Sequence, residues 1–387
     1  MRSTMPTTMN NGQDLFARIG IRPVINACGI YTDLGGSRLS PAVWAAAQEL
    51  NGQFVRMTEL LDKTGERIAS LLDVEAARIT PGAAAAIFLG TAACLAGKDG
   101  EKSQQLPDTA GMKSDVLIQA GHRYKYDRQV GMTGAKLIEI GSKNGTRLDQ
   151  LEAAIGANTA AILHPAHLDG KPGTIALEEV VRIAHARGVP VIVDAAYLNY
   201  PTSIMGDYVR RGADLVCISA KYFGGPNAGG FVMGRRDLIE AVSNVHFTRY
   251  ESGKYLKLGR PLKMDRQIVI AVLVALEEWL ATDHAARFAA YERQVQMLQT
   301  RLSGLKGLRL EPKCFTMDER FIDEPVNCLV ITFDTKETAG NVARQLEDAN
   351  PSILAIHEGD RIGIVMDVLR DDEVSHIGER ISSLLTK

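Results

Sequence analysis

The stretch VPVIVDAAYLNYP (189–201), continued by GADLVCISAKYFGGPNAGGFVMG (212–234), decides the fold of this chain. Each part holds a short run, VIVDA or DLVCIS, that is apolar on both faces, which is typical of a buried parallel strand. Asp194 closes the first run, and Lys221 follows the end of the second. Because parallel strands end at the same edge of a sheet, we expect both side chains at the carboxyl edge, where open α/β sheets bind ligands.

Outward from this stretch, β-rich runs alternate with helical patterns such as LEEVVRIAHARG (177–188). This alternation predicts an α/β fold with a mostly parallel, seven-stranded sheet that helices cover on both faces. The expected strands are ARIT (77–80), DVLIQ (115–119), KLIEIG (136–141), TAAILH (159–164), VPVIVDA (189–195), DLVCIS (214–219) and GFVMG (230–234).

The pattern changes after residue 260, where residues 264–302 read as one long helical stretch. A smaller α/β unit should follow it. We therefore expect an N-terminal segment (1–44), a large cofactor-binding domain (45–260), and a third part (261–387) that holds the long helix and a small C-terminal domain. The small domain should contain strands at 326–334, 352–358 and 361–367 and helices at 337–349 and 371–385.

Composition excludes several classes of partner. The formal net charge is −2, so the chain has no excess of positive charge to hold nucleic acid or an anionic membrane, and a small molecule is the expected partner. The five cysteines show no metal-ligand spacing, which predicts no metal site and suits a reducing cytoplasm. The N-terminal residues lack an apolar signal core, and no window approaches the roughly 20 apolar residues of a membrane span.

Asp194 and Lys221 together suggest pyridoxal 5′-phosphate (PLP) chemistry. A lysine can form a Schiff base with the aldehyde, and a carboxylate can keep the pyridine nitrogen protonated so that the ring absorbs carbanion electrons. The alternative is that Asp194 caps a strand and Lys221 is a solvated loop residue. The surrounding motifs favour the cofactor.

A phosphate site is the first of these motifs. TPGAAAAIFLG (80–90) reads as a strand end that turns into a helix, and the N–H groups of Gly82, Ala83 and Ala84 can bind phosphate there. Ser219 could add a hydroxyl, or could only satisfy a turn. An alanine-rich helix start is also common in α/β proteins that bind no phosphate.

The loop QAGHRYKYDRQV (119–130) follows an expected strand and should open at the same edge. Either His122 or Tyr124 could stack on the pyridine ring. Arg123 and Lys125 could bind an anionic substrate. The alternative is an ordinary exposed loop, although its position favours a catalytic role for His122.

Two further loops offer candidates. In LHPAHLDGKPG (163–173), His164 or His167 could reach the phenolic oxygen of the cofactor, or could be structural. In KYLKLGRPLKMDRQ (254–267), Arg260 and Lys263 could bind a carboxylate or phosphate of the substrate, or belong to a solvated basic linker.

These motifs resemble the fold type I family of PLP enzymes, and within it the branch of bacterial selenocysteine synthase and D-glucosaminate-6-phosphate ammonia-lyase, with the ammonia-lyase subgroup the more similar. The resemblance covers nearly the whole chain. The segments that carry it are RPVINACGIYTDLGGSRLSP (22–41), AHLDGKPGTIALEEVVRIAH (166–185), GADLVCISAK (212–221) with GGPNAGG (224–230), and GRPLKMDRQIVIAVLVALEEWL (259–280).

The resemblance implies the aspartate aminotransferase fold and a homodimer or ring of dimers, with active sites completed by the neighbouring chain. It implies that Lys221 carries the internal aldimine, that Asp194 pairs with the pyridine nitrogen and that His122 stacks on the ring. Asn26 and Thr32 are then expected to close over the substrate.

Two departures from the branch bear on function. The lysine loop reads ISAKYFGGPN (218–227), whereas relatives more often have a Ser-Gly-Gly-Lys turn, which bears on the phosphate role of Ser219. The tRNA-binding extension of selenocysteine synthases is missing, which together with the charge argues against a tRNA substrate.

We therefore expect a cytoplasmic PLP-dependent lyase that releases ammonia by α,β-elimination from a small, anionic β-hydroxy amino acid or amino-sugar acid. The same residues would serve a transaminase, an aldolase or a racemase. A selenocysteine synthase-type transferase and a non-catalytic PLP sensor are the remaining alternatives.

Overall fold

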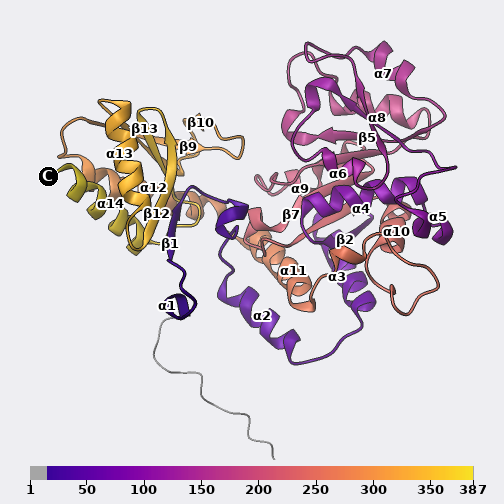
Figure 1. The fold of residues 1–387 in the computed structure, drawn as a ribbon, viewed down its shortest axis with the longest axis horizontal. Coiled ribbons are helices and arrows are strands. Elements are labelled where there is room, and N and C mark those ends of the chain that lie inside the picture. Colours follow the sequence, from indigo (N-terminus) through magenta and orange to yellow (C-terminus); the bar gives the residue numbers. More distant parts are fainter. Residues whose placement is uncertain (1–14, 387) are drawn as a thin grey trace, which may run out of the picture. The chain divides into compact units, whose positions relative to one another are not determined.

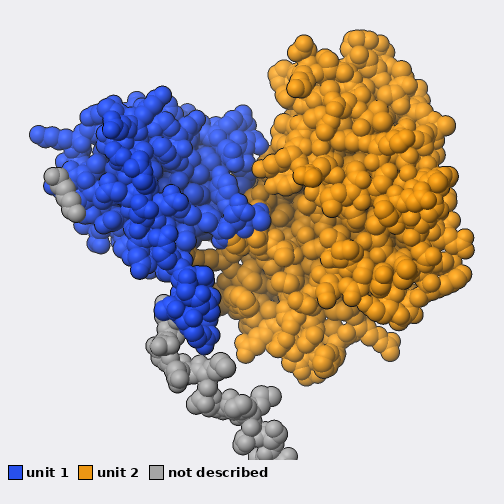
Figure 2. Space-filling model, in the orientation of Figure 1, with its two compact units in different colours: residues 1–34, 283–387 blue, residues 35–282 orange. Residues whose placement is uncertain are grey.

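The computed structural model describes residues 15–386. They form two compact units, which Figure 2 colours separately. The larger unit is Gly35–Thr282, and the smaller unit combines the described residues up to Leu34 with those from Asp283 onward. The units thus divide the chain at other positions than the expected parts 1–44, 45–260 and 261–387.

A seven-stranded sheet is the centre of the larger unit (Figure 1). All seven runs expected as strands form it, and only the last in sequence runs antiparallel to its two neighbours, so the predicted mostly parallel sheet is confirmed. In pairing order the strands are β2 (Ala76–Thr80), β8 (Gly230–Gly234), β7 (Leu215–Ser219), β6 (Val191–Asp194), β5 (Thr159–Pro165), β3 (Asp115–Gln119) and β4 (Lys136–Ile140).

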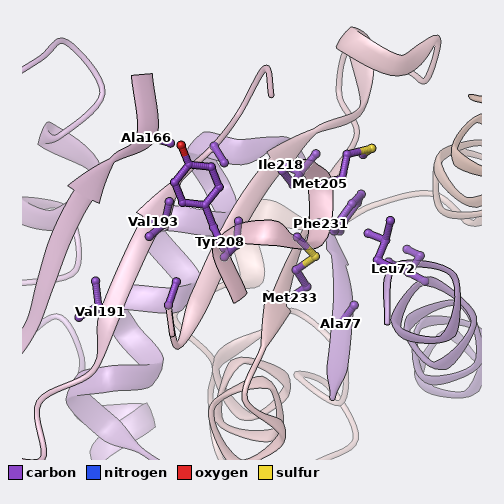
Figure 3. Packing of buried hydrophobic residues seen from close by; sticks show 14 of the residues in the cluster. Leu72, Ala77, Ala166, Val191, Val193, Met205, Tyr208, Ile218, Phe231 and Met233 are labelled. Carbon is purple, nitrogen blue, oxygen red and sulfur yellow. The ribbon is translucent and has the colours of Figure 1, made fainter. Parts of the chain in front are cut away.

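Helices cover both faces of this sheet because its central strands are apolar on both sides. Figure 3 shows one face, to which Val191 and Val193 of β6 and Phe231 and Met233 of β8 contribute, with β7 between the two strands. This face packs against α3 (Met57–Leu72), α8 (Leu177–His185), α9 (Ile204–Arg210) and α11 (Arg266–Ala281), and the other against α4 (Ala83–Ala96), α6 (Arg128–Gly131) and α10 (Arg236–Val245). The remaining helices of the unit are α2 (Pro41–Asn51), α5 (Gly100–Gln105) and α7 (Leu148–Ala154).

The prediction of one long helix over 264–302 was wrong. The stretch forms two helices, α11 and α12 (His284–Leu302), which are interrupted at Thr282 and Asp283. The Asp283 carboxylate accepts a hydrogen bond of 3.0 Å from the backbone N–H of Ala286 and so caps the second helix. A capping aspartate satisfies an otherwise unpaired N–H group and starts a new helix there. The boundary between the two units falls at the same place.

The smaller unit contains a six-stranded sheet. Its N-terminal strand pairs in parallel with a strand near the end of the chain, and neither this pairing nor two further strands after α12 were predicted. In pairing order the strands are β1 (Val24–Ala27), β12 (Ser352–Glu358), β13 (Arg361–Val365), β11 (Cys328–Phe333), β9 (Leu308–Phe315) and β10 (Phe321–Ile322). The other helices of this unit are α1 (Leu15–Ile19), α13 (Lys336–Glu347) and α14 (Asp371–Leu385).

Membrane insertion through a helix finds no support in the part of the chain that the structure describes, since none of its helices is both long and apolar enough to span a bilayer.

A close approach of α3 to β2 gives a test of the packing. A β-carbon on Gly65 would lie 2.2 Å from the carbonyl oxygen of Ala77, so Gly65→Ala must push the helix away from the strand. Helix propensity alone would favour alanine by about 1 kcal/mol, but such overpacking costs about 1–3 kcal/mol. We expect Gly65→Ala to lower the free energy of unfolding in urea titrations.

Gly131→Ala is the matched control, since Gly131 also lies in a helix of the larger unit and an added β-carbon would meet no described atom within 4 Å. Equal stability of Gly65→Ala and the wild type would contradict the proposed close packing.

Candidate active site

Asp194 and Lys221 lie at the carboxyl ends of two neighbouring strands. Asp194 ends β6 and pairs in register with Cys217 of β7. Lys221 follows β7 in the short 3₁₀ helix η4 (Ala220–Phe223), and its Nζ lies 4.8 Å from the centre of the Tyr222 ring. Both residues are buried, with 4% and 8% of their surfaces exposed. The structure thus has the arrangement that the sequence predicted for this pair.

Asp194 is held by two hydrogen bonds. The Tyr124 hydroxyl donates to Oδ2 over 2.5 Å, and the backbone N–H of Ala196 donates to Oδ1 over 3.1 Å. Burial raises the pKa of Asp194, whereas the two hydrogen bonds and the nearby His167 act against this shift. A cationic partner stabilises the ionised form of a buried carboxylate, and a protonated pyridine nitrogen would supply such a cation.

Four aromatic side chains in mutual contact link Asp194 to Lys221. The ring of His167 lies 5.2 Å from that of Tyr124 and 5.9 Å from that of Tyr197, centre to centre, and the rings of Tyr197 and Tyr222 lie 6.0 Å apart. These residues follow four different strands of the sheet, β3, β5, β6 and β7. They therefore provide apolar surface at its carboxyl edge, suited to a flat heterocyclic ring.

The turn before α4 has the features of a phosphate site. Gly82 has a φ of +89°, which favours glycine, and the helix that it caps has no acidic residue in its first turn. A β-carbon on Gly230 would lie 2.8 Å from the Gly82 Cα, so β8 also requires glycine at this approach. Ser219 pairs in register with Gly230, which brings its backbone close to the helix start. Unpaired N–H groups at such a start bind anions.

Taken together, these residues fit PLP. The first N–H groups of α4, including those of Ala83 and Ala84, offer donors to a phosphate, whereas the Gly82 N–H donates to the Thr80 carbonyl over 2.8 Å and shapes the turn. Asp194 offers a carboxylate to the pyridine nitrogen, and Lys221 offers an amine to the aldehyde. No cluster of three or more potential metal-ligating side chains occurs within residues 15–386.

His122 lies in the short 3₁₀ helix after β3. It is fully buried, its Nε2 lies 3.0 Å from the Leu168 carbonyl oxygen, and its ring lies 4.8 Å from that of His164. His164 follows Ile162 of β5 by two residues and therefore lies on the same face of the sheet. Asp194 follows Ile192 of β6 by two residues and lies on the opposite face. Ring stacking by His122 stays a prediction, while Tyr124 makes the observed contact with Asp194.

The two histidines proposed for the phenolic oxygen separate in the structure. His164 is 1% exposed, its Nε2 lies 3.1 Å from Asp169 Oδ1, and Arg211 pairs with the other oxygen of that carboxylate at 2.7 Å. His167 instead lies among the aromatic residues next to Asp194. Of the two, His167 has the better position for contact with a cofactor.

The first two candidates for binding an anionic substrate are exposed. Arg123 forms ion pairs with Asp127, at 2.5 Å, and with Glu139. Lys125 lies over the ring of Tyr126, at 5.3 Å. Because Arg123 already has two carboxylate partners, binding of an anion would have to compete with them.

The other two basic candidates lie before α11. Arg260 pairs with Glu251 at 2.9 Å and contacts the ring of Tyr250, and Lys263 is exposed. Their roles in substrate binding stay predictions.

Asn26 and Thr32 belong to the smaller unit. The Asn26 amide donates to the Gly29 carbonyl over 2.7 Å and accepts from the Cys28 N–H over 2.9 Å, so it holds the turn after β1. Thr32 is exposed and starts a short 3₁₀ helix (Thr32–Leu34). Closure of these two residues over a substrate stays a prediction.

Three features of the site were missed from the sequence. Tyr197 and Tyr222 each follow a strand end closely, as do Asp194 and Lys221, and that position was the available signal. The need for glycine at residue 230 appears only when the approach of β8 to the turn before α4 is known.

A mostly parallel seven-stranded sheet with this carboxylate, lysine and phosphate turn at one edge defines a fold type I PLP enzyme. The family described as SelA, L-seryl-tRNA selenium transferase, matches residues 24–306, and the chain belongs to this family.

Relatives within and near this family have different activities. The chain is 31% identical over 301 residues to a D-glucosaminate-6-phosphate ammonia lyase of Salmonella typhimurium, covering 76% of this chain and 77% of the relative. It is also 31% identical over 304 residues to a 5′-C-glycyluridine monooxygenase-decarboxylase of a Streptomyces species, covering 76% and 72%. An L-seryl-tRNA(Sec) selenium transferase of Moorella thermoacetica is 28% identical over 296 residues, covering 70% of this chain and 58% of the relative.

Solved structures agree with this assignment. A structure of D-glucosaminate-6-phosphate ammonia-lyase superposes with a TM-score of 0.83 at 26% identity, covering 97% of this chain and 100% of that one. A NifS-like protein, with a TM-score of 0.55 at 17% identity, covers 95% of this chain and 100% of that one and shares the fold alone.

The hydrogen bond from Tyr124 to Asp194 gives a test of the site. Tyr124→Phe removes a donor from a buried carboxylate, so the pKa of Asp194 should rise further and its pairing with a protonated ring should weaken. A lost hydrogen bond to a charged group corresponds to roughly a tenfold weaker affinity for PLP. Absorbance titration of the cofactor-free protein measures this, with Tyr126→Phe at an exposed neighbouring tyrosine as control. Equal affinities of the two variants would count against the role of Tyr124.

The buried His122 gives a test through pH. Burial and the neighbouring His164 lower the pKa of His122 from 6.5 to about 4. The unfolded chain therefore binds more protons than the folded chain between these values, and stability present above pH 6.5 is lost as the pH falls toward 4. This loss amounts to at most about 3 kcal/mol.

His122→Gln should lose less stability than the wild type over the same pH range, in urea unfolding at a series of pH values. His357→Gln, at an exposed histidine, serves as the control. Identical pH slopes for wild type and His122→Gln would refute the assignment of this loss to His122.

Proposed function

We propose that this chain is a PLP-dependent lyase that releases ammonia from a small, anionic β-hydroxy amino acid or amino-sugar acid and forms a 2-oxo acid. The observation that carries the proposal is the similarity to D-glucosaminate-6-phosphate ammonia-lyase, which extends over 97% of the chain at a TM-score of 0.83. The substrate is proposed as a chemical class.

In this proposal the cofactor is held at three places. The N–H groups of Ala83 and Ala84, at the helix start that Gly82 caps, and the Ser219 hydroxyl would hold the phosphate, Asp194 would pair with the pyridine nitrogen, and Lys221 would supply the amine for the aldehyde. When bound, PLP supplies an electron sink that stabilises negative charge at the substrate Cα.

Lys221 is then the residue that moves the proton. With PLP bound, the neutral amine of Lys221 would accept the proton from the substrate Cα. Its protonated form would deliver that proton to the departing β-hydroxyl, which leaves as water. The enamine that remains then takes up one water and gives the 2-oxo acid and ammonia. The burial of Lys221 and its contact with the Tyr222 ring hold the amine at this edge of the sheet.

Tyr124, Tyr197 and Tyr222, together with His167, have positioning roles in this mechanism. Tyr124 keeps the Asp194 carboxylate oriented through its 2.5 Å hydrogen bond. His167 and the other two tyrosines limit the access of water to the ring face by their mutual contacts.

An assembly of at least two chains is part of the proposal. The exposed large apolar side chains of the larger unit include Trp44, at 62% in α2, and Phe54, at 96% just after it. Aromatic residues exposed in this way are typical of interfaces. A homodimer or a ring of dimers would cover them.

Ammonia release is the decisive measurement. Purified protein with PLP is incubated with a panel of β-hydroxy amino acids and amino-sugar acids, and ammonia, amino transfer, aldehyde release, loss of optical activity and oxygen uptake are followed separately. Oxygen uptake is followed because the Streptomyces relative is described as a monooxygenase-decarboxylase. We expect ammonia and a 2-oxo acid from at least one substrate.

Lys221→Ala should lower ammonia release by about 10²–10⁴-fold, the usual contribution of a positioned acid–base group. It should also lose the visible absorbance band that borohydride bleaches in the wild type. Lys63→Ala is the control, because Lys63 is exposed and pairs with Glu66 on the surface. Activity in another channel without ammonia from any β-hydroxy substrate would exclude the proposed reaction.

A further inference from the structure

The turn that carries Lys221 is short and closes on one of its own carbonyl groups. The N–H groups of Gly224 and Gly225 both donate to the Ala220 carbonyl, the second over 2.8 Å. Gly224 has a φ of +80°, which lets the chain turn back toward β8. Short 3₁₀ segments have poor hydrogen-bond geometry. Contacts from other elements therefore decide how firmly the backbone at Lys221 is held.

Asn199, in the loop after β6, makes such a contact. Its side-chain amide donates to the backbone carbonyl of Tyr222, the residue that follows Lys221. The last carbonyl groups of a helix lack partners within the helix, so this amide satisfies an acceptor that η4 leaves open. The Ser219 N–H, just before the turn, donates to the Ala196 carbonyl of the same loop over 3.0 Å. The lysine turn is thereby joined to the loop after β6 at two places.

Trp279 of α11 holds Asn199 in turn. Its indole N–H donates to the backbone carbonyl of Asn199 over 2.9 Å. The same helix lies against the far end of the lysine turn, where a β-carbon on Gly229 would lie 2.5 Å from Val272 Cγ2. Phe223 of the turn is buried in the same apolar cluster as Val272. Helix α11, the loop after β6 and the lysine turn are therefore packed together.

The backbone of this turn matters for chemistry because Lys221 has a long side chain. Its ammonium stands on a flexible four-carbon stem, so the backbone beneath the stem sets which atoms the amine can reach. In the proposed function the same amine must attach to the aldehyde and later accept a proton from the substrate Cα. A misplacement of about 1 Å from a reactive geometry can cost about 10²-fold in rate.

We propose that Asn199 is a positioning residue for Lys221 and that the indole N–H of Trp279 orients Asn199. The Asn199 amide fixes the Tyr222 carbonyl, and this fixes the backbone of the turn and the place of the lysine amine. The inference rests on the role of Lys221 in the proposed function, but not on which reaction follows. Covalent attachment, in which the amine nitrogen bonds to the aldehyde carbon of PLP and one water leaves, is therefore the step to measure.

Reconstitution of the cofactor-free, full-length protein with saturating PLP gives a readout that does not depend on turnover. Total bound PLP is measured after removal of the free cofactor, and the covalent fraction is the part that borohydride fixes to the protein. The attachment rate follows from the growth of the visible band after rapid mixing. We expect Asn199→Ala to lower this rate by roughly 10–100-fold and to lower the covalent fraction of the bound cofactor.

Two further variants test the hydrogen bonds themselves. Asn199→Asp removes the donating amide with almost no change in shape, and an ionised carboxylate cannot donate to the Tyr222 carbonyl, so attachment should be at least as slow as in Asn199→Ala. Trp279→Phe removes the indole N–H and should give a smaller loss in the same direction. A wild-type rate and covalent fraction in a folded Asn199 variant or, if neither folds, in Trp279→Phe would overturn the proposal.

Asn158→Ala is the matched control for a purely structural loss. The Asn158 amide also joins two elements, because it donates to Ser114 Oγ over 3.4 Å, but it lies where β3 and β5 begin, at the opposite edge of the sheet from Lys221. Any decrease in the thermal midpoint of this variant should leave the attachment rate and the covalent fraction unchanged. If Asn158→Ala lowers both as much as Asn199→Ala does, reduced stability explains the effect and the positioning role is refuted.

Lys221→Ala separates this inference from the proposed function. If this variant keeps the band that borohydride bleaches, another lysine attaches the cofactor and both proposals fail. If it loses the band while the Asn199 variants attach PLP as the wild type does, the role of Lys221 stands and the positioning role alone fails. Absence of ammonia from every substrate would reject the proposed reaction, and slow attachment in the Asn199 variants would still support the positioning role.

Discussion

The Asp194 carboxylate, 4% exposed at the end of β6, is the constraint on which the rest of the site depends. A carboxylate that is cut off from water must be supplied with donors or charge, or it becomes protonated. Tyr124 from the loop after β3 and the N–H of Ala196 supply two donors. The strand order then places β7 next to β6, and thereby Lys221 on the adjoining turn. In the proposed function, the protonated pyridine ring of PLP would supply the positive charge that this carboxylate lacks.

A second constraint is the close approach of the β8 backbone at Gly230 to the turn at Gly82 before α4. Strand β8 runs antiparallel between β2 and β7, and Gly230 allows it to meet Gly82 directly. The phosphate turn is therefore fixed to the same sheet as Ser219, through backbone contacts that a side chain would prevent. The proposed cofactor, bound between this turn and Asp194, would be held by several strands of one sheet, so its orientation would depend on main-chain geometry more than on flexible loops.

Local sequence patterns were sufficient for the large sheet, because each of its strands is a short apolar run bounded by turn residues. They failed at Thr282 and Asp283, where an amphipathic pattern continues across a capping aspartate. In the site, Asp194 and Lys221 could be placed because a strand end fixes the edge of the sheet. The sequence favoured His122 over Tyr124, but it could not reveal the hydrogen bond from Tyr124 to Asp194, which depends on how the loop after β3 folds.

The smaller unit is assembled from both ends of the chain, because β1 pairs only with β12 among the described strands. This has a consequence for the order of folding on the ribosome. All seven strands of the large sheet emerge before β12 is synthesised, so the larger unit can fold while β1 still lacks its partner strand. An unpaired strand edge can associate with other chains. The nascent protein is therefore most exposed to misassembly between completion of the large sheet and release of its last residues.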